Sequence, residues 1–368
     1  MIFEPINEGF VCLLASDGPT SVAMAPRCAV AANGQLVCTY RVQSALGVND
    51  KMPMISRSRN NGETWSEQGH IWPALEDKYS ISCSVSRSPS GELFLYGTRT
   101  PIDEPGEPYW SDVTHGMKQN ELIWARSAES GYTWTDPTVI PVQIPGSAEA
   151  PGAMCITRGG RWIAPYAPYN TYDPHLVVER NQVVAMVSDN EGKTWTHRSM
   201  LRFDDADSGG SESWVVELAD GRLLGTSWHH SYSDGSDYPN AYAISLDGGL
   251  TWGTTRSTGI MGQSAALAAL PDGRALFIYN QRKHGEIGVW LAIIAPTESD
   301  FGVEANEIVW RAETGTQTGT SGELFEWTDF SFGEPSVTLL PDGALLAALW
   351  CIHPSGRGVK YVKLRMAH

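Results

Sequence analysis

Six polar or charged positions stand directly before runs of apolar residues, and they are the first candidates for chemistry. They are Arg27, Ser82, Glu149, Glu212, the pair Gln263-Ser264, and Glu334. Three glutamates and an arginine would be costly fillers of a core, because burying an unpaired charge is unfavourable. Carboxyl groups that share one site can perform acid/base and nucleophilic chemistry, and glycoside hydrolysis uses such a pair. That chemistry requires a fold that brings these positions together.

An eight-residue repeat indicates how distant positions meet. The pattern Ser-x-(Asp/Asn/Glu)-x-Gly-x-Thr-Trp occurs four times, at residues 58–65, 127–134, 188–195 and 245–252, each time after a β-rich stretch. The polar residue suits a tight turn because it caps backbone amides, and the glycine tolerates a positive φ. Repeats at such spacing predict a fold assembled from copies of one sheet unit.

A second repeat consists of an apolar run, a turn ending in glycine, and another apolar run. Its six copies begin at Cys28, Ser84, Met154, Trp214, Ala265 and Pro335. Asp-Gly or Asn-Gly between apolar runs is a strong hairpin signal, and no helical periodicity extends over a useful length. Six hairpins predict six blades of about 60 residues each.

These patterns predict an all-β fold, a six-bladed β-propeller of four-stranded antiparallel blades that occupies residues 1–368 as one domain. The last blade has only three strands of its own, and residues 9–15 are expected to supply the fourth. Such closure removes the free sheet edges of an open ring. A propeller directs its innermost strands toward one axis, so the six polar positions would converge there.

Composition limits the classes of partner. The net charge of −16 argues against nucleic acid or an anionic membrane as the main partner, and a carbohydrate substrate is expected instead. The six cysteines lack metal-type spacing and favour buried free thiols, so neither a metal nor a cofactor is expected. The first 18 residues lack a basic segment followed by a long apolar run, which predicts a cytoplasmic protein, or a secreted one if a leader has been removed. The oligomeric state stays open.

With these repeats, nearly the whole chain resembles the sialidase superfamily of six-bladed propellers with Asp-box repeats. The resemblance implies that Arg27 grips a sugar carboxylate, with Arg41 as a further arginine, and that Asp50 is the acid/base. It implies that Glu212, in Glu-x-x-Val-Val-Glu-Leu-x-Asp-Gly-Arg, activates the nucleophile. Arg282, in Asn-Gln-Arg-Lys-His-Gly, matches the family's third binding arginine.

Two departures from the family pattern bear on the substrate. Trp228 stands where the second carboxylate-binding arginine belongs, and Glu334 stands where the nucleophilic tyrosine belongs. Sialic acid carries a carboxylate on its anomeric carbon, which would repel an anionic nucleophile, whereas an ordinary aldose suits a carboxylate nucleophile. Losing one arginine also weakens the charge-assisted grip on a carboxylate. The sequence therefore predicts an exo-acting glycoside hydrolase that removes a terminal sugar other than sialic acid.

Four carboxyl groups compete for two catalytic roles. A second branch of the superfamily, the exo-arabinanases, uses glutamates on neighbouring blades, and Glu149 and Glu212 resemble that pair. We expect Glu334 or Glu212 to act as nucleophile or base, and Asp50 or Glu149 to act as acid. Like-charged neighbours should keep one of them protonated.

Aromatic and histidine side chains are further candidates for sugar binding. His229 and His230 end an inner hairpin, and adjacent strand residues face opposite ways, so at most one reaches the site; we take His229 as the substrate-binding candidate. Sugar rings pack on aromatic faces, and the candidates for such stacking are Tyr109, Trp110, Tyr166, Tyr169, Tyr172 and Trp228.

Three alternatives to this function stay open. The first is an exo-arabinanase-like hydrolase. The second is a polysaccharide lyase acting on a uronate, in which Arg27 and Arg282 neutralise the carboxylate while His229 or a tyrosine takes the proton. The third is a non-catalytic propeller that binds glycans.

Overall fold

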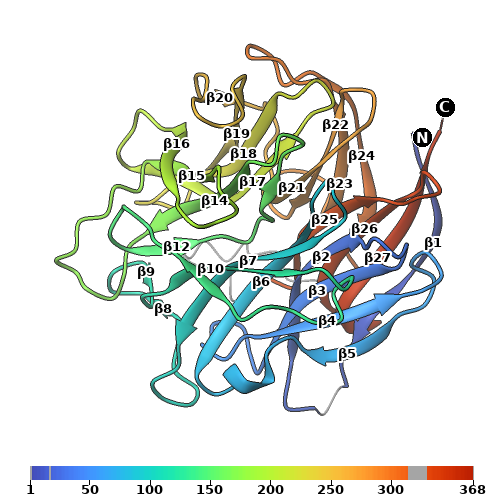
Figure 1. Ribbon diagram of the computed structural model, residues 1–368, viewed down its shortest axis with the longest axis horizontal. Helices are drawn as coiled ribbons and strands as arrows, with labels where there is room; N and C mark the ends of the chain where they lie inside the picture. Colours follow the sequence, from blue (N-terminus) through green and yellow to red (C-terminus); the bar gives the residue numbers. More distant parts are fainter. Residues whose placement is uncertain (1, 16–17, 314–329, 368) are drawn as a thin grey trace.

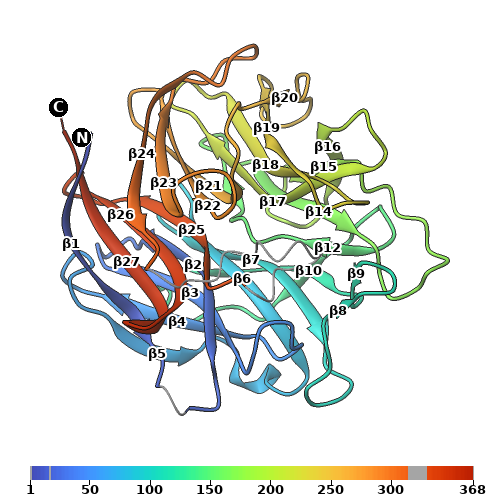
Figure 2. The same ribbon diagram turned by 180° about the vertical axis from the view of Figure 1, so that it is seen from behind.

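The computed structural model describes residues 2–15, 18–313 and 330–367, and these form an all-β ring of six sheets (Figures 1 and 2). Each blade has four antiparallel strands in its main path, and the third has one additional short strand, so the predicted six-bladed propeller is confirmed. The 3-10 turn Pro73–Leu75 is the one helical element in the described ranges. None of the described helical structure is long and apolar enough to cross a membrane.

The strands of each blade follow one another along the chain from the axis outward. The first three blades are β2 (Val22–Val30), β3 (Leu36–Gln43), β4 (Met52–Ser58) and β5 (Ser66–His70); β6 (Tyr79–Arg87), β7 (Leu93–Pro101), β10 (Glu121–Ser127) and β11 (Thr138–Ile140); and β12 (Ser147–Glu149), β14 (Trp162–Tyr169), β15 (Gln182–Ser188) and β16 (Thr196–Arg202), with β13 (Cys155–Ile156) also paired to β14.

The next three blades repeat this order, and the last one borrows a strand from the other end of the chain. They are β17 (Ser208–Glu217), β18 (Leu223–Ser231), β19 (Asp237–Ser245) and β20 (Arg256–Ser257); β21 (Gln263–Ala269), β22 (Ala275–Gln281), β23 (Gly288–Ile294) and β24 (Val303–Arg311); and β25 (Phe332–Leu339), β26 (Leu345–His353), β27 (Gly356–Met366) and β1 (Phe3–Leu13). A small hairpin, β8 (Trp110–Ser111) with β9 (Gly116–Met117), interrupts the second blade.

The N-terminal strand closes the ring, as the sequence predicted. β1 pairs with β27 from Phe3 opposite Met366 to Leu13 opposite Gly358, which leaves the two chain ends side by side in both views (Figures 1 and 2). The pairing begins earlier than the expected segment 9–15. Because β1 covers the outer edge of β27, the sixth blade has four strands like the other blades.

Side chains of the eight-residue repeat hold each turn together. In the third blade, Ser188 Oγ accepts a hydrogen bond from the Gly192 amide at 2.9 Å, and Asn190 Oδ1 accepts one from the Thr194 amide at 2.9 Å. The Trp195 indole donates to the Gly192 carbonyl at 3.0 Å. Gly192 has a φ of +77°, and a Cβ there would lie 2.8 Å from the Trp124 ring, so both backbone conformation and space favour glycine.

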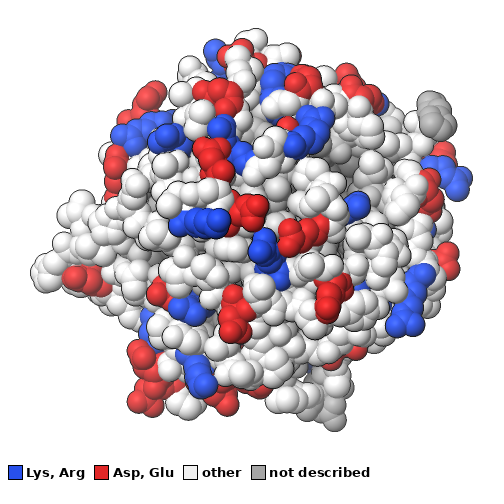
Figure 3. Space-filling model, in the orientation of Figure 1, with Lys and Arg blue, Asp and Glu red and all other residues white. Residues whose placement is uncertain are grey.

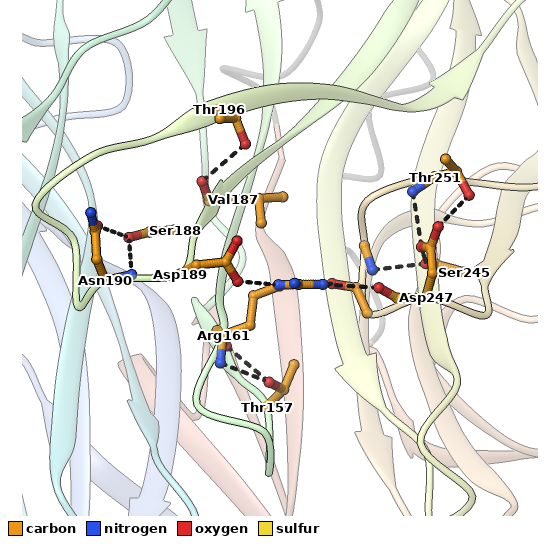
Figure 4. A network of polar contacts seen from close by, with 12 residues as sticks. Thr157, Arg161, Val187, Ser188, Asp189, Asn190, Thr196, Ser245, Asp247 and Thr251 are labelled. Carbon is orange, nitrogen blue, oxygen red and sulfur yellow. Dashed lines mark hydrogen bonds and ion pairs between the residues drawn. The ribbon is translucent and has the colours of Figure 1, made fainter.

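Arg161 links the turns of two adjacent blades (Figure 4). Its Nε donates to Asp189 Oδ1 at 2.6 Å in the third blade. Its Nη1 donates to the carbonyls of Asp247 and Gly248 in the fourth blade, at 2.9 and 3.1 Å. One guanidinium thus joins two copies of the repeat that begin 57 residues apart, and it stabilises the contact between the blades.

We expect Arg161→Ala to lower the free energy of unfolding by about 1–2 kcal/mol, because three hydrogen bonds are lost but Asp189 is well exposed to solvent. Chemical denaturation would measure the change. Arg202→Ala is the matched control, since Arg202 forms only a surface ion pair with Glu179 in which both side chains are 55% exposed. An equal loss in both variants would contradict a special role for the bridge between blades.

Candidate functional site

Four inner strands carry a β-bulge at the same place near the axis. In β2, β17, β21 and β25 the ladder shifts register there, and one non-glycine residue has a positive φ: Ala25 at 53°, Glu212 at 54°, Ser264 at 42° and Glu334 at 44°. A bulge re-aims a side chain, and a left-handed non-glycine residue costs about 1–3 kcal/mol that its surroundings must hold in place. Such strain, repeated around the axis, marks this end of the ring as the candidate site.

A cavity of about 230 Å³ opens where these bulges meet. Three carboxyl groups line it, those of Glu149, Glu212 and Glu334. Four basic side chains line it as well, namely Arg41, Lys51, Arg282 and Lys283. Aromatic side chains from several blades form much of its wall, among them Tyr109, Trp110, Tyr169, Trp228, Tyr232 and Trp350. Acid/base groups, cations and aromatic faces are therefore gathered in one concave site.

The three carboxyl groups have different surroundings. Arg41 Nη2 forms an ion pair with Glu334 Oε1 at 3.0 Å, and Arg41 Nη1 donates to Ser82 Oγ at 2.8 Å. Glu149 Oε2 accepts a hydrogen bond from the Glu212 amide at 3.0 Å. Glu334 Oε2 and Glu212 Oε2 are buried and have no hydrogen-bond partner among the described residues. One carboxyl group is thus paired with an arginine, while another has no basic partner of its own in the described part of the chain.

Burial and mutual repulsion separate the acidities of these groups. Burial, and then the charge of Glu334, raises the pKa of Glu212 to about 7. Burial, and then the charge of Glu212, raises the pKa of Glu149 well above its usual range. The site therefore combines Glu334, which is paired with an arginine, with two carboxyl groups, Glu149 and Glu212, whose raised pKa values favour the protonated form, and acid/base catalysis uses such a difference.

Arg27 is buried and is not among the residues that line the cavity, although the sequence predicts that it binds the substrate. Its side chain is 1% exposed and donates to the carbonyls of Pro151 at 3.2 Å, Pro26 at 2.9 Å and Glu334 at 2.8 Å. Its guanidinium also lies 5.1 Å from the centre of the Trp214 ring. Arg27 therefore ties three blades together and holds the backbone of Glu334.

We expect Arg27→Met to lower the free energy of unfolding by about 3 kcal/mol, because it leaves three buried carbonyls without their donor. Thermal and chemical unfolding would measure the loss. An unchanged stability together with a higher KM would restore the sequence interpretation of Arg27 as a substrate-binding residue.

Three other predicted residues also lie away from the cavity. The Asp50 carboxylate accepts a hydrogen bond from the Ser44 amide at 3.2 Å, and the neighbouring Lys51 lines the cavity in its place. His229 stacks on Phe203 with ring centres 4.4 Å apart, whereas His230 lines the cavity. Tyr166 is 1% exposed and packs in the core of the third blade.

The other predicted residues are brought together. The cavity lining includes Arg41, Glu149, Glu212, Trp228, Arg282 and Glu334. It also includes the stacking candidates Tyr109, Trp110 and Tyr169, but Tyr172 is outside it. Sequence reasoning missed Lys51, because this residue stands just before β4, outside the strands, where alternation assigns no face.

A buried carboxylate organises one wall. Asp237 accepts a hydrogen bond from the Trp228 indole at 3.0 Å, and its other oxygen lies 3.0 Å from His284 Nε2. Gln263 Nε2 also reaches Asp237, at 3.4 Å, while Gln263 Oε1 accepts a hydrogen bond from Arg282 Nε at 2.7 Å. Trp228 and Arg282, which lie on different blades, are therefore fixed relative to each other.

A second polar group lies beside Trp228, whose ring centre is 5.1 Å from that of His230. His230 Nε2 lies 2.9 Å from Ser211 Oγ and 3.3 Å from the Tyr169 hydroxyl, and the Tyr169 hydroxyl also contacts Ser211 Oγ. Burial lowers the pKa of His230, so its imidazole is neutral at pH 7 and suits hydrogen bonding to a hydroxyl group. Among the residues that the structure describes, no group of three or more His, Cys, Asp and Glu side chains is placed to hold a metal ion.

The outer surface differs from the cavity. On the face shown in Figure 3, acidic and basic side chains are interspersed and form no contiguous basic patch. The concentration of basic groups at the axis is therefore a local feature of a chain whose net charge is −16.

Comparisons with known proteins agree with this architecture. A protein of unknown function from Dyadobacter fermentans DSM 18053 has the same fold with a TM-score of 0.76 at 19% identity, covering 100% of both chains. The Penicillium chrysogenum alpha-L-arabinanase complexed with arabinobiose matches with a TM-score of 0.67 at 14% identity, over 98% of both chains. The NanB sialidase from Streptococcus pneumoniae matches with a TM-score of 0.63 at 14% identity, over 97% of this chain and 70% of its own.

These likenesses establish the fold that this chain shares with a sialidase and an arabinanase, and they confirm the resemblance inferred from its repeats. The sequence matches no curated protein at a significant level. The family model described as BNR repeat-like domain matches residues 83–313, which is more than half of the 368 residues. The chain belongs to the BNR repeat-like domain family.

Proposed function

We propose that this chain, acting as one catalytic domain, is an exo-acting glycoside hydrolase that removes a terminal sugar from a glycan or glycoside. The observation that carries the proposal is the convergence of Glu149, Glu212 and Glu334 on one cavity, where burial raises the pKa values of Glu149 and Glu212. The small cavity supports exo-action, since about 230 Å³ is below the roughly 300–1,000 Å³ of sites for larger ligands.

The proposed roles follow from the partners of each carboxyl group. Glu334 is ion-paired with Arg41 and keeps its second oxygen free of hydrogen bonds, so it serves as the nucleophile or as the base that activates water. Glu212, with its pKa near neutral, donates a proton to the leaving oxygen and can take it back later. Glu149 accepts a hydrogen bond from the Glu212 amide and thereby holds Glu212 in its left-handed backbone conformation.

The wall supports recognition of a sugar ring. Trp228 and the aromatic residues around Tyr109 offer flat apolar faces to the C–H groups of a sugar. His230 and Arg282 offer hydrogen-bonding groups for hydroxyl or acidic substituents. Because the fold is similar to that of an alpha-L-arabinanase, arabinofuranosides are included among the substrates to test.

A panel of aryl glycosides tests this proposal. Neutral pyranosides, arabinofuranosides, uronides and sialosides would be incubated with the wild-type protein and followed by release of the aryl alcohol. Hydrolysis of at least one non-sialoside class is expected. An unsaturated product absorbing in the ultraviolet would show a lyase, and glycan binding without turnover of any glycoside would show a binding module. Efficient hydrolysis of sialosides would overturn the interpretation of Trp228 and Glu334.

A further inference from the structure

Lys51 extends a buried amine into the cavity from the junction of the first two blades. Its backbone is fixed there, because its amide donates to Ser80 Oγ at 3.0 Å and its carbonyl accepts from the Ile81 amide at 2.7 Å. Its Nζ lies 3.4 Å from the centre of the Tyr109 ring, an arrangement that favours a cation over a π face. The position of this side chain is therefore set by both blades and by the hairpin loop of the second.

The Lys51 ammonium has no hydrogen-bond acceptor or ion-pair partner among the described residues. The acidic groups that act on it are engaged elsewhere, since Glu334 pairs with Arg41, Asp50 accepts from the Ser44 amide and Glu149 accepts from the Glu212 amide. Burial, and then the charge of Arg41, lowers the pKa of Lys51 to about 7. A buried cation without a countercharge is costly to the protein, and an anionic ligand would remove that cost.

The net charge of the cavity supports the same conclusion. The ion pair of Arg41 with Glu334 is neutral overall, and the raised pKa values of Glu149 and Glu212 reduce their negative charge near pH 7. Lys51 then has little negative charge beside it, and Arg282 and Lys283 add further basic groups to the lining, in a chain that carries a net charge of −16. A positive pocket in an acidic protein is complementary to a small anion and unsuited to a cationic ligand.

We propose that Lys51 binds the carboxylate of an acidic sugar, so that the terminal residue recognised by this site is a uronic acid. The carboxylate must be carried away from the reacting carbon, because a carboxylate on the anomeric carbon would face the ionised Glu334. A uronic acid meets this condition, since its acidic group is carried on C5 and the anomeric carbon bears only hydrogen besides the ring and glycosidic oxygens. The assignment of Glu334 as the reacting group rests on the proposed function, but the binding of the acid by Lys51 does not.

Proton linkage gives this proposal a specific signature. A bound carboxylate stabilises the ammonium form, so binding near pH 8 must be accompanied by uptake of a proton by Lys51. Affinity should be constant below pH 7 and should fall by up to about tenfold per pH unit above it, until the pKa of Lys51 in the complex is reached. The other charged groups facing Lys51 are Arg41, Glu334, Asp50 and Glu149, and none of them is altered by the substitutions below.

Titration calorimetry in a Glu212→Gln background tests the proposal, because this substitution removes the titration of Glu212 and the free monosaccharides have no glycosidic bond to be cleaved. Galacturonate and glucuronate would be compared with galactose and glucose at pH 8, in two buffers of different ionisation enthalpy. We expect the acids to bind about 10- to 100-fold more tightly than the neutral sugars, with proton uptake. Adding Lys51→Met should abolish both the preference and the uptake.

Lys51→Arg is the matched variant, since an arginine keeps its charge at pH 8. It should retain a preference for the acids but lose the proton uptake, which a purely structural role of Lys51 would not produce. Equal binding of acids and neutral sugars, absence of acid binding, or uptake that persists in Lys51→Met would overturn the proposal. If a neutral glycoside is hydrolysed but acids are not preferred, the Lys51 proposal fails and the proposed hydrolase function is retained. If acids bind but no uronide is hydrolysed, the proposed hydrolase function fails and the Lys51 site is retained.

Discussion

Glu334→Gln should lower kcat/KM on the best aryl glycoside at least about 10³-fold, with most of the loss in kcat. Glutamine keeps the shape and can still accept a hydrogen bond from Arg41, but it cannot form a glycosyl ester or take a proton from water. The ion pair with Arg41 at 3.0 Å and the unpartnered second oxygen are the features that suit Glu334 to attack or to activate water. Steady-state kinetics over a range of pH would measure the effect.

A matched control separates chemistry from folding. Glu121→Gln removes the charge of a glutamate that is ion-paired with Arg99 at 2.7 Å on the surface, far from the cavity lining, and should leave kcat/KM unchanged. Thermal unfolding of both variants would verify that they fold. A Glu334→Gln protein that folds normally and retains more than a tenth of the wild-type kcat would remove Glu334 from the reaction.

The fold was predictable because its determinants are local. Turn residues such as Asn190 and Gly192 make their contacts within one eight-residue repeat. A hairpin is indicated in the sequence by an Asp-Gly or Asn-Gly pair between two apolar runs. Counting these units gave the number of blades, and the missing strand of the last blade identified β1 as its partner. The position of the glutamates at the axis followed from the same count, since each stands where an inner strand begins its approach to the centre.

The side-chain directions at the site were not predictable, and β-bulges are the common reason. Between Met24 and Arg27, two residues of β2 stand opposite one residue of β3, and Arg27, just after this bulge, does not line the cavity. A register shift between Ser227 and His229 similarly decides which of the two histidines faces the axis. Alternation assigns faces only while the ladder is regular, and these bulges contain no glycine or proline at the turned position to reveal them.

The bulges also connect the fold to the proposed function. Glu212 and Glu334 adopt left-handed conformations that an ordinary strand would avoid, and Arg27 holds the backbone of Glu334 while Glu149 holds that of Glu212. The surrounding structure thus stabilises strained residues whose side chains then point to one place. Local strain supported by buried hydrogen bonds is what preorganised sites use to fix reacting groups.

Glu212→Gln should reduce kcat/KM about 10²- to 10⁴-fold on glycosides with poor leaving groups, and much less on those with activated aryl leaving groups that need no proton. Because the donor must be protonated, wild-type activity should fall as pH rises through about 7, and this alkaline limb should disappear in the variant. A limb that persists in Glu212→Gln but is lost in Glu149→Gln would transfer the donor role to Glu149, whose pKa is also raised by burial.

The same substitution should stabilise the protein in a pH-dependent way. The pKa of Glu212 rises from 4.5 to about 7 on folding, so between these values the folded state holds a proton that the unfolded state has released. Wild-type stability must therefore decrease as pH rises through this window, by up to about 3 kcal/mol at roughly 1.4 kcal/mol per pH unit. Glutamine does not titrate, so Glu212→Gln should gain stability relative to wild type from pH 4 to pH 8. Denaturation midpoints at both pH values would measure the gain, and a difference that is independent of pH would contradict a carboxyl group strained toward its protonated form.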